Sequence, residues 1–416
     1  MLSIVLLSGC LNQRIIEDPD EVKKLHEQEN VTLELWHTYS EEETRIFEQE
    51  VVPRFHALHP DIQIKPVRVS HTRELRSTLI ARATSHKTPD IIRMDIVWVP
   101  QFAHLGVLYP VSSFPDFDEV KQSLHPVALE TNMYEGVYYG IPLNINTKTA
   151  VYNKLLLKTA GYSEPPDTIQ ELFQIAEQRN YVIGMASVEP WYSLPYFYAL
   201  GGKLTDPDFK QASGYFNHPD SVRAIDEMVR LHQAGVLGPD MFSRTADLWG
   251  GILSNRIFMI DAGPWFFSIQ QSQPADRLKL DKVISVPFPN QSLDTSILGG
   301  ENLVISKGTK FAEEAWTFLK WMAEEEAQML MASTGILPTH METAEKLHED
   351  AEKMSYVQSY MDALDHAFLR PPVINWEQID EVYVTYLTHI FQGEMETEAA
   401  LTEAAQKMDQ LLQVEP

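Results

Sequence analysis

The chain has 416 residues, of which 44% are hydrophobic and 22% are charged, as is typical of a folded globular protein and not of a disordered one. This length exceeds what a single hydrophobic core usually serves, so at least two lobes are expected. Lys and Arg number 33 against 59 Asp and Glu, and the formal charge of −26 at pH 7 argues against a nucleic-acid-binding surface, which needs clustered cations.

The N-terminal stretch is apolar and ends in Ser8-Gly9-Cys10, where Cys10 is the only cysteine of the chain. Small residues before a cysteine, after an apolar stretch, resemble the processing signal of bacterial lipoproteins, in which the thiol is acylated. The resemblance implies that residues 1–10 are a signal-peptide remnant and that Cys10 is lipidated, which anchors the protein on the extracytoplasmic face of the cell membrane. The alternative is an ordinary apolar fragment, since the basic residues that open a secretory signal are missing.

Residues 11–30 are polar and charged and are interpreted as a tether. Beyond them, segments with the two-residue period of strands alternate with segments that carry an apolar helix face. Strands are expected at 31–36, 62–65, 89–94 and 182–185, and helices at 41–59, 73–84, 170–179, 222–234, 312–331, 355–368 and 377–412. This alternation implies α/β units around a mainly parallel sheet.

Five groups of short motifs follow one another in a characteristic order. They are Leu35-Trp36-His37-Thr38-Tyr39; Thr88-Pro89-Asp90 with Met94-Asp95 and Leu105-Gly106; Tyr139-Gly140-Ile141-Pro142 with Tyr152-Asn153-Lys154; Phe258-Met259 through Gly263-Pro264-Trp265; and Leu298-Gly299-Gly300-Glu301-Asn302 with Ala315-Trp316. In this order they resemble the family 1 extracellular solute-binding proteins, the substrate receptors of ABC importers, many of which bind sugars. The similarity runs from residue 31 to about residue 343.

The resemblance implies a periplasmic-binding-protein-like α/β fold, in which crossing hinge segments join two α/β lobes around a ligand cleft. The N-terminal lobe is expected at 31–143 and 288–325, and the C-terminal lobe at 144–287 and 326–416. Because both lobes would contact the ligand, binding would favour a closed state that the membrane permease recognises. A monomeric, non-catalytic receptor without a cofactor is expected.

A sugar presents hydroxyl groups around its ring and C–H groups on its two faces, so its site needs aromatic planes and hydrogen-bonding carboxylates or amides. Both occur where the resemblance places the cleft, and Glu189-Pro190-Trp191 resembles the Glu-Pro-aromatic element of maltose-type receptors. The candidate aromatic contacts are Trp265, Trp191, Trp376 and Tyr39, and the candidate polar contacts are Asp95, Glu189, Asn144, Asn146, Glu301, Asn302, His37 and Glu43. For each tryptophan, packing within a lobe is the alternative.

A neutral ligand is expected, because the candidate residues are aromatic, amide or acidic. A polyol or a sugar phosphate stays open, since Arg93, Lys148 and Lys203 are near the candidates in the sequence. A receptor that reports to a membrane sensor and a glycoside hydrolase are further alternatives, the latter needing two carboxyl groups at a set separation. No metal site is predicted, because a zinc site at His56 and His59 would need further ligands.

Overall fold

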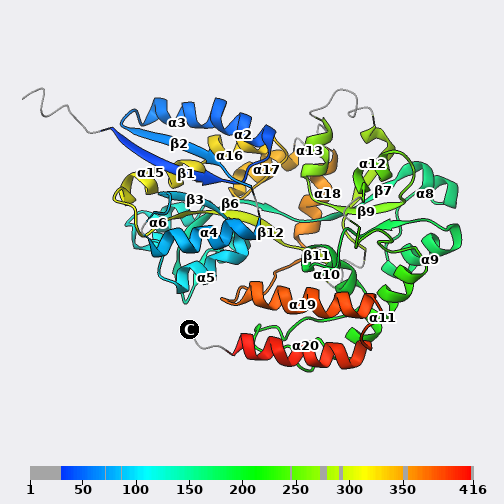
Figure 1. Ribbon diagram of the computed structural model, residues 1–416. Coiled ribbons are helices and arrows are strands. Elements are labelled where there is room, and N and C mark those ends of the chain that lie inside the picture. The colour runs from blue at the N-terminus through cyan, green and yellow to red at the C-terminus, as the bar shows by residue number, and fades with distance from the viewer. Residues whose placement is uncertain are drawn as a thin grey trace, which may run out of the picture.

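The computed structural model describes residues 30–413 except 71, 86, 244–245, 272–278, 290–293 and 350–354. Cys10, the predicted signal remnant and all but the last residue of the predicted tether lie outside these ranges. Within them, no helix combines the length and the apolar character that crossing a membrane would require. The described chain forms two lobes, each built on a sheet with helices around it (Figure 1).

The first lobe is built on a six-stranded sheet with the order β13-β6-β12-β3-β1-β2. Its strands are β1 (Val31–His37), β2 (Ile62–Arg68), β3 (Ile91–Asp95), β6 (Gly140–Asn146), β12 (Gly299–Ile305) and β13 (Leu337–Pro338). β1 runs parallel to β2 and β3, whereas β12 and β6 run antiparallel to their neighbours. The sheet is therefore mixed and not mainly parallel as expected, because β12 and β13 run against β1, β2, β3 and β6, which makes three of its five strand pairings antiparallel.

Helices flank this sheet, and the lobe also contains a two-stranded hairpin. They are α2 (Glu41–Ile46), the π-helical turn η1 (Phe47–Val51), α3 (Val52–Leu58), α4 (Arg73–Thr84), η2 (Ile96–Trp98), α5 (Val99–His104), η3 (Val111–Ser113), α6 (Phe117–Lys121), α7 (Pro126–Glu130), α15 (Ala312–Ala323), α16 (Glu325–Ala332) and α17 (Met341–Glu349), with β4 (Met133–Tyr134) and β5 (Val137–Tyr138). Ser40 starts α2 through a capping box with Glu43, which fixes the chain where it leaves β1.

The predicted boundary after residue 325 needs correction. Residues from 326 onward were expected in the C-terminal lobe, yet α16 packs on β13 and η1, and Ala327 and Met331 lie in the same buried cluster as Leu33 and Phe47. The apolar face of α16 therefore belongs to the first lobe. Two other boundaries were set by the expected ranges: the one between residues 143 and 144 falls inside β6, and the one between 287 and 288 comes too early, because Phe288 packs against Tyr196 of the second lobe.

The second lobe is built on a four-stranded sheet with the order β10-β7-β9-β8. Its strands are β7 (Thr149–Asn153), β8 (Ile183–Gly184), β9 (Met259–Ala262) and β10 (Val283–Val286). Its helices are α8 (Lys154–Ala160), α9 (Ile169–Arg179), α10 (Pro190–Ala199), α11 (Pro219–Gln233), α12 (Leu248–Leu253), α13 (Trp265–Gln271), η4 (Leu280–Lys282), α18 (Ser355–Leu364), α19 (Trp376–Phe391) and α20 (Thr397–Leu412), and β11 (Ser296–Ile297) pairs with β14 (Ala367–Phe368).

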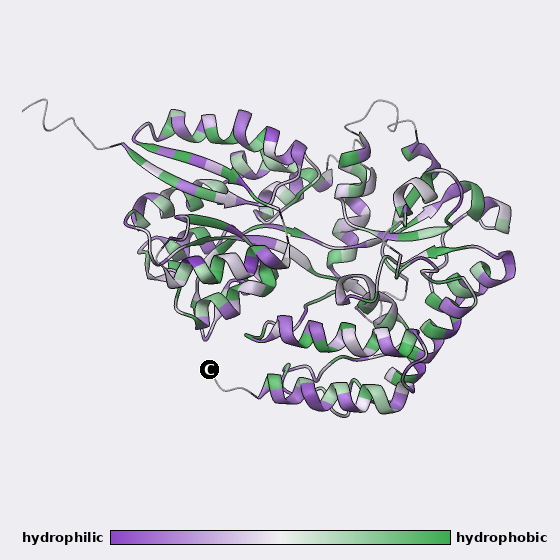
Figure 2. Cartoon of the chain, viewed as in Figure 1, coloured by the Kyte–Doolittle hydropathy of each residue, from purple (hydrophilic) through white to green (hydrophobic). Residues whose placement is uncertain are grey.

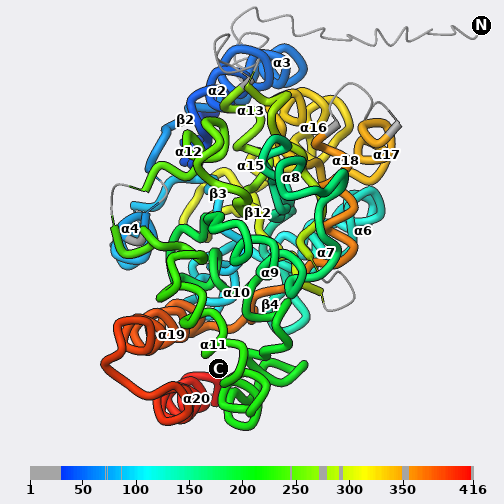
Figure 3. Tube along the Cα trace, turned by 90° about the vertical axis from the view of Figure 1, so that its right-hand side faces the viewer, coloured from blue at the N-terminus to red at the C-terminus, as the bar shows by residue number. Residues whose placement is uncertain are grey.

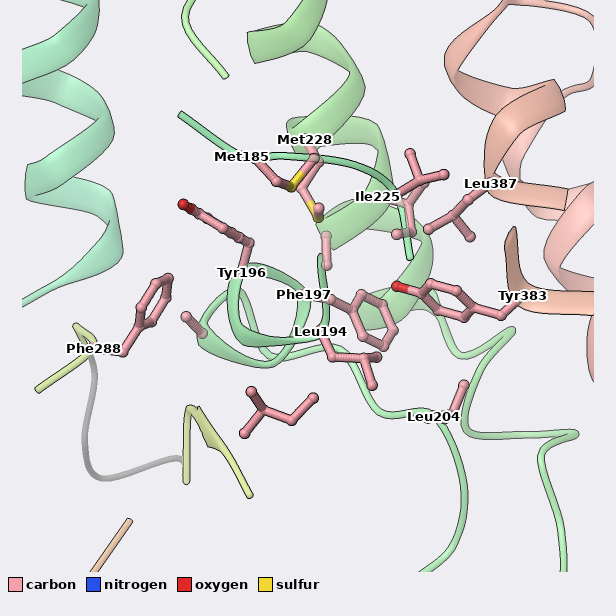
Figure 4. Close-up of a cluster of buried hydrophobic side chains, with 14 of the residues drawn as sticks. Met185, Leu194, Tyr196, Phe197, Leu204, Ile225, Met228, Phe288, Tyr383 and Leu387 are labelled. Atoms are coloured by element: carbon pink, nitrogen blue, oxygen red, sulfur yellow. The ribbon is translucent and has the colours of Figure 1, made fainter. Parts of the chain in front are cut away.

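The core of this lobe joins α10, α11 and α19 through side chains such as Phe197, Ile225 and Tyr383 (Figure 4). The two C-terminal helices lie side by side at the end of the molecule remote from α3 (Figure 3). Hydrophobic and hydrophilic residues alternate along them and along β1 and β2 (Figure 2), as expected of elements that have one face on a core and the other in water.

Crossing strands connect the two sheets and set the geometry of the space between them. β6 ends at Asn146 in the first sheet, and β7 starts at Thr149 in the second, so the chain changes lobe within Thr147 and Lys148. β12 returns to the first sheet beside β6. Side chains on the ends of β6 and β12 consequently lie at the junction of the lobes, where ligands bind in open α/β folds.

Candidate ligand-binding cleft

Two adjoining cavities lie between the lobes, with volumes of about 690 and about 460 Å³. Both are lined by Thr38, Asn146, Trp265 and Glu301, so they adjoin one another at these side chains and are treated as two parts of one cleft. The first cavity also contains Tyr39, Ser40, Glu43, Arg68, Arg93 and Asn144, and the second contains Asp95, Glu189, Trp191, Tyr192 and Arg370. The first sheet and both α10 and α13 of the second lobe therefore contribute to one site.

The first-lobe wall is a hydrogen-bonded network around a buried cation. The side chain of Arg93 is 5% exposed, and its Nη2 lies 2.8 Å from Oε2 of Glu301. The same guanidinium donates to Thr38 Oγ1 at 2.6 Å and to Asn144 Oδ1 at 3.2 Å. Asn144 in turn donates to Glu301 Oε2 at 2.6 Å. Two candidates from the sequence, Asn144 and Glu301, are thus brought together with Arg93 on the neighbouring strands β6, β12 and β3.

Tyr39 lies directly against this network. Its ring centroid is 4.4 Å from the Cζ atom of Arg93, and burial raises the pKa of its phenol above the usual value, so the ring stays neutral. Glu43 stands at the first turn of α2, where its carboxylate accepts from the backbone N–H of Ser40 at 2.7 Å. Both predicted residues line the first cavity.

Each cleft tryptophan packs on a glycine. Trp265 folds back over Gly263, where an added Cβ atom would overlap the indole ring. A Cβ atom on Gly299 would stand 2.7 Å from the Cη2 atom of Trp191, which is also too close. The two indoles lie with their ring centroids 6.2 Å apart and their planes 25° apart. A larger residue at Gly263 or Gly299 would therefore overlap the indole that packs there.

The second cavity contains an ion pair that sequence reasoning missed. Arg370 Nη2 lies 3.4 Å from Asp95 Oδ1, and the Arg370 Cζ atom is 5.4 Å from the ring centroid of Trp191. Asp95 also caps η2 by accepting from the N–H of Val97. Glu189, which is exposed at the start of α10, also lines the second cavity. The sequence around Arg370 does not indicate that this residue lines the cleft, and its only local feature is the pair of prolines that follows.

The other cations that left an anionic ligand open, Lys148 and Lys203, do not line either cavity. Lys148 is 1% exposed and pairs with Asp261 of β9. Its Nζ atom lies against the ring of Trp191 and is 4.1 Å from the ring centroid of Tyr192. Burial lowers the pKa of Lys148, and the charge of Asp261 opposes that shift. Lys203 is exposed in the loop before α11 and lines neither cavity.

Three candidate residues do not reach the cleft, which corrects the sequence expectation. Asn302 follows Glu301 on β12 and points to the opposite face, where its side chain bonds Thr131 and Asn132. His37 is fully buried on the core face of β1. Trp376 is 4% exposed at the start of α19 and packs in the core. Within the described ranges no three His, Cys, Asp or Glu side chains form a group that could hold a metal ion.

Comparisons with known proteins agree with this architecture. A model of the bacterial extracellular solute-binding protein family matches residues 50–355 of the chain. The maltotriose-binding protein of Pyrococcus abyssi is 24% identical over 352 residues, which cover 81% of this chain and 72% of that protein. The diacetylchitobiose binding protein DasA of Streptomyces coelicolor is 22% identical, with 78% of each chain covered.

Among solved structures, the chain is similar to the GacH receptor of Streptomyces glaucescens, determined unliganded and in complex with acarbose and an acarbose homolog. The two structures superpose with a TM-score of 0.81 at 25% identity, over 93% of this chain and 100% of the receptor. The two-lobed fold described above is therefore shared along nearly the whole length of both chains.

Proposed function

Because this chain belongs to the bacterial extracellular solute-binding protein family, we propose that it is the carbohydrate receptor of an ABC importer. It binds an oligosaccharide between its lobes and delivers it to the membrane permease. The observation that carries the proposal is one cleft that combines Trp191 and Trp265 with the carboxylates and amides of Glu301, Asn144 and Asn146. Indole faces bind the C–H faces of sugars, while carboxylates and amides bind their hydroxyl groups.

The dimensions of the cleft favour a ligand with more than one ring. Each cavity falls within the range of about 300–1,000 Å³ that is usual for small-molecule sites, and Trp265 lines both of them. The similar proteins named above bind maltotriose, diacetylchitobiose and acarbose, which supports a carbohydrate. A sugar ring in each cavity, with Trp265 between them, uses the whole cleft.

The charges of the cleft favour a neutral ligand over a sugar phosphate. The carboxylates of Glu43, Asp95, Glu189 and Glu301 face three guanidinium groups, and two of those, on Arg93 and Arg370, are paired with Glu301 and Asp95. The third, on Arg68, donates to the carbonyl of Tyr39. A phosphate that bound to Arg93 or Arg370 would have to displace the carboxylate paired with it, which would leave that carboxylate without its cation in a largely buried place.

The receptor acts outside the cytoplasm as a monomer, and acylation of Cys10 keeps it near its permease. Tethering raises the effective concentration of a binding partner without any new contact. Replacing Cys10 with Ser should move the protein from the membrane fraction to the medium. Equal retention of the Cys10→Ser variant in the membrane fraction would contradict the anchor.

The test of ligand class is a thermal-shift screen with maltotriose, diacetylchitobiose, acarbose, monosaccharides and a phosphorylated sugar. A ligand at about 100 times its Kd adds about 2.7 kcal/mol to stability. We expect an uncharged oligosaccharide to raise the Tm, and Trp265→Ala to abolish most of that rise. Trp36→Ala is the matched control, because Trp36 is a partly exposed tryptophan on β1 that bonds Glu34 outside the cleft.

Two results of this screen would contradict the proposal. One is a shift seen only with the phosphorylated sugar, and the other is a shift that Trp265→Ala leaves unchanged. Chromatography of the sugars recovered after incubation tests the absence of catalysis, since a receptor returns them intact whereas a hydrolase shortens them.

A further inference from the structure

Arg93 is a buried cation under the cleft, and its contacts are with the protein itself. A charge that is 5% exposed is unfavourable unless other groups compensate it. Compensation comes from Glu301, Asn144, Thr38 and the ring of Tyr39. The Nε atom is buried as well and has no hydrogen-bond partner among the described residues.

The contacts of Arg93, Asn144 and Glu301 form a closed triangle that permits one arrangement only. The Oδ1 atom of Asn144 accepts from Arg93, and its Nδ2 atom donates to Glu301. Reversing the amide would place two donors against each other, so Arg93 and Glu301 together fix its orientation. The Oε2 atom of Glu301 accepts a hydrogen bond from Asn144 at 2.6 Å and forms an ion pair with Nη2 of Arg93 at 2.8 Å.

The second oxygen of Glu301 remains for a ligand. Within the described ranges no donor to Oε1 is found, the side chain is 17% exposed, and Glu301 lines both cavities. The exposed part of the carboxylate therefore faces the cleft. An acceptor that is already oriented loses little conformational freedom when a hydroxyl group binds to it.

We propose that Arg93 is a positioning residue for carbohydrate binding: it holds Glu301 and Asn144 in place as a ready hydroxyl-binding pair and does not itself receive the ligand. This inference rests on the proposed function. Three neighbouring strands supply the three side chains, and β12 places Glu301 opposite Asn144 on one side and opposite Asp95 on the other. Groups on central strands are held more rigidly than groups on loops, which suits this role.

A double-mutant cycle with Arg93→Met and Glu301→Gln tests the proposal. Affinity is measured by calorimetry with maltotriose, or with the oligosaccharide of the screen above that stabilises the wild type most. Hydrogen bonds to charged groups contribute enough that each single change should weaken binding by about 10- to 100-fold. In the Glu301→Gln background, Arg93→Met should weaken it by less than about 3-fold, because Arg93 acts through Glu301.

Unfolding of the same variants separates positioning from support of the fold. Arg93→Met leaves the partly buried carboxylate of Glu301 without its cation and should lower the Tm, whereas the double variant removes both charges and should regain most of that loss. If Arg93→Met alone does not fold, the double variant is compared with Glu301→Gln, and equal affinities support the proposal.

Several outcomes would overturn it. An equal loss from Arg93→Met in both backgrounds means that Arg93 contacts the ligand or acts only on the fold, and no loss in either means that it has no role in binding. If the wild type binds none of the sugars, the proposed function fails first and the role of Arg93 fails with it. If the wild type binds a sugar but the two substitutions weaken that binding additively, the proposed function stands and this inference alone is lost.

Discussion

Arg370 and Asp95 join the two lobes across the second cavity, with Nη2 and Oδ1 3.4 Å apart and both side chains less than one-fifth exposed, at 11% and 17%. Asp95 ends a central strand of the first sheet, whereas Arg370 precedes α19 of the second lobe. A second contact joins the same two segments, because the indole N–H of Trp98 donates to Glu377 Oε1 at 3.1 Å. These segments therefore link the lobes beside the candidate site.

The contact between Trp98 and Glu377 should stabilise the arrangement with the lobes together. Trp98→Phe removes the N–H donor while keeping an aromatic ring, and it lies outside both cavities. Since one such hydrogen bond contributes about 0.5–1.5 kcal/mol, we expect a loss of affinity of about 2- to 10-fold. The loss should be the same for every sugar bound, because it acts on the conformational equilibrium and not on a ligand contact.

Calorimetry with two different oligosaccharides measures this effect, and small-angle scattering of the free variant should show a larger radius of gyration than that of the wild type. A loss confined to one sugar would identify Trp98 as a specificity residue. Unchanged affinity for both sugars would show that the contact does not help to hold the lobes together.

Gly263 should be needed for the position of Trp265. A Cβ atom at this site overlaps the indole, so Gly263→Ala should displace the ring and weaken carbohydrate binding by at least about 10-fold, while the strain costs about 1–3 kcal/mol of stability. Gly308→Ala is the matched control, since a Cβ atom there would meet nothing nearer than Thr88 Oγ1 at 3.6 Å. Binding is followed by tryptophan fluorescence and calorimetry.

Equal effects of the two alanine substitutions would contradict this account of the turn. Intact binding by Gly263→Ala, with a folded protein confirmed by circular dichroism, would move Trp265 out of the site.

His37 should make stability depend on pH. Burial, followed by the charges of Arg93 and Arg68, lowers its pKa from 6.5 to about 4. Between these values the unfolded chain binds more protons than the native protein does, so the contribution of His37 is fully present above about pH 6.5 and is lost as the pH falls towards 4. At about 1.4 kcal/mol per unit of pKa shift, roughly 2 kcal/mol should be lost between pH 7 and pH 4.5.

Urea unfolding of the wild type and His37→Phe at both pH values isolates this contribution. The variant keeps an aromatic ring between Tyr39 and Phe47 but does not titrate. Burial also lowers the pKa of His56 and His125, and their effect cancels in the difference. The same loss in both proteins would show that His37 does not carry the dependence.

The order of elements and part of the site could be predicted, because both depend on local patterns. The helix expected at 73–84 is α4, and alternation located β1 and β2. The helix expected at 312–331 breaks at Glu324, where ψ is 158° although glutamate favours helices, so the break reflects the packing of α15 and α16 on the first sheet. The helix expected at 355–368 ends at Leu364, because Ala367–Phe368 pairs with β11 as β14.

The site residues were harder to predict where their role depends on distant contacts. Arg370 meets Asp95 across 275 residues, and nothing near either one indicates the other. Glu301 and Asn302 were both expected in the cleft, although neighbours on a strand point to opposite faces and only one can face it. Which one does so is decided by the pairing of β12 with β6 and β3. Trp376 also lies in the core because of contacts with distant segments, which the sequence around it does not indicate.

The central claim is that an oligosaccharide binds between the lobes and draws them together, and small-angle X-ray scattering with and without a saturating sugar tests it most directly. The account predicts a smaller radius of gyration when the wild type binds maltotriose or the best sugar of the screen, one sugar per chain, and no change for Trp265→Ala at the same concentration. Saturable binding with an unchanged radius, or equal compaction of Trp265→Ala, would contradict it.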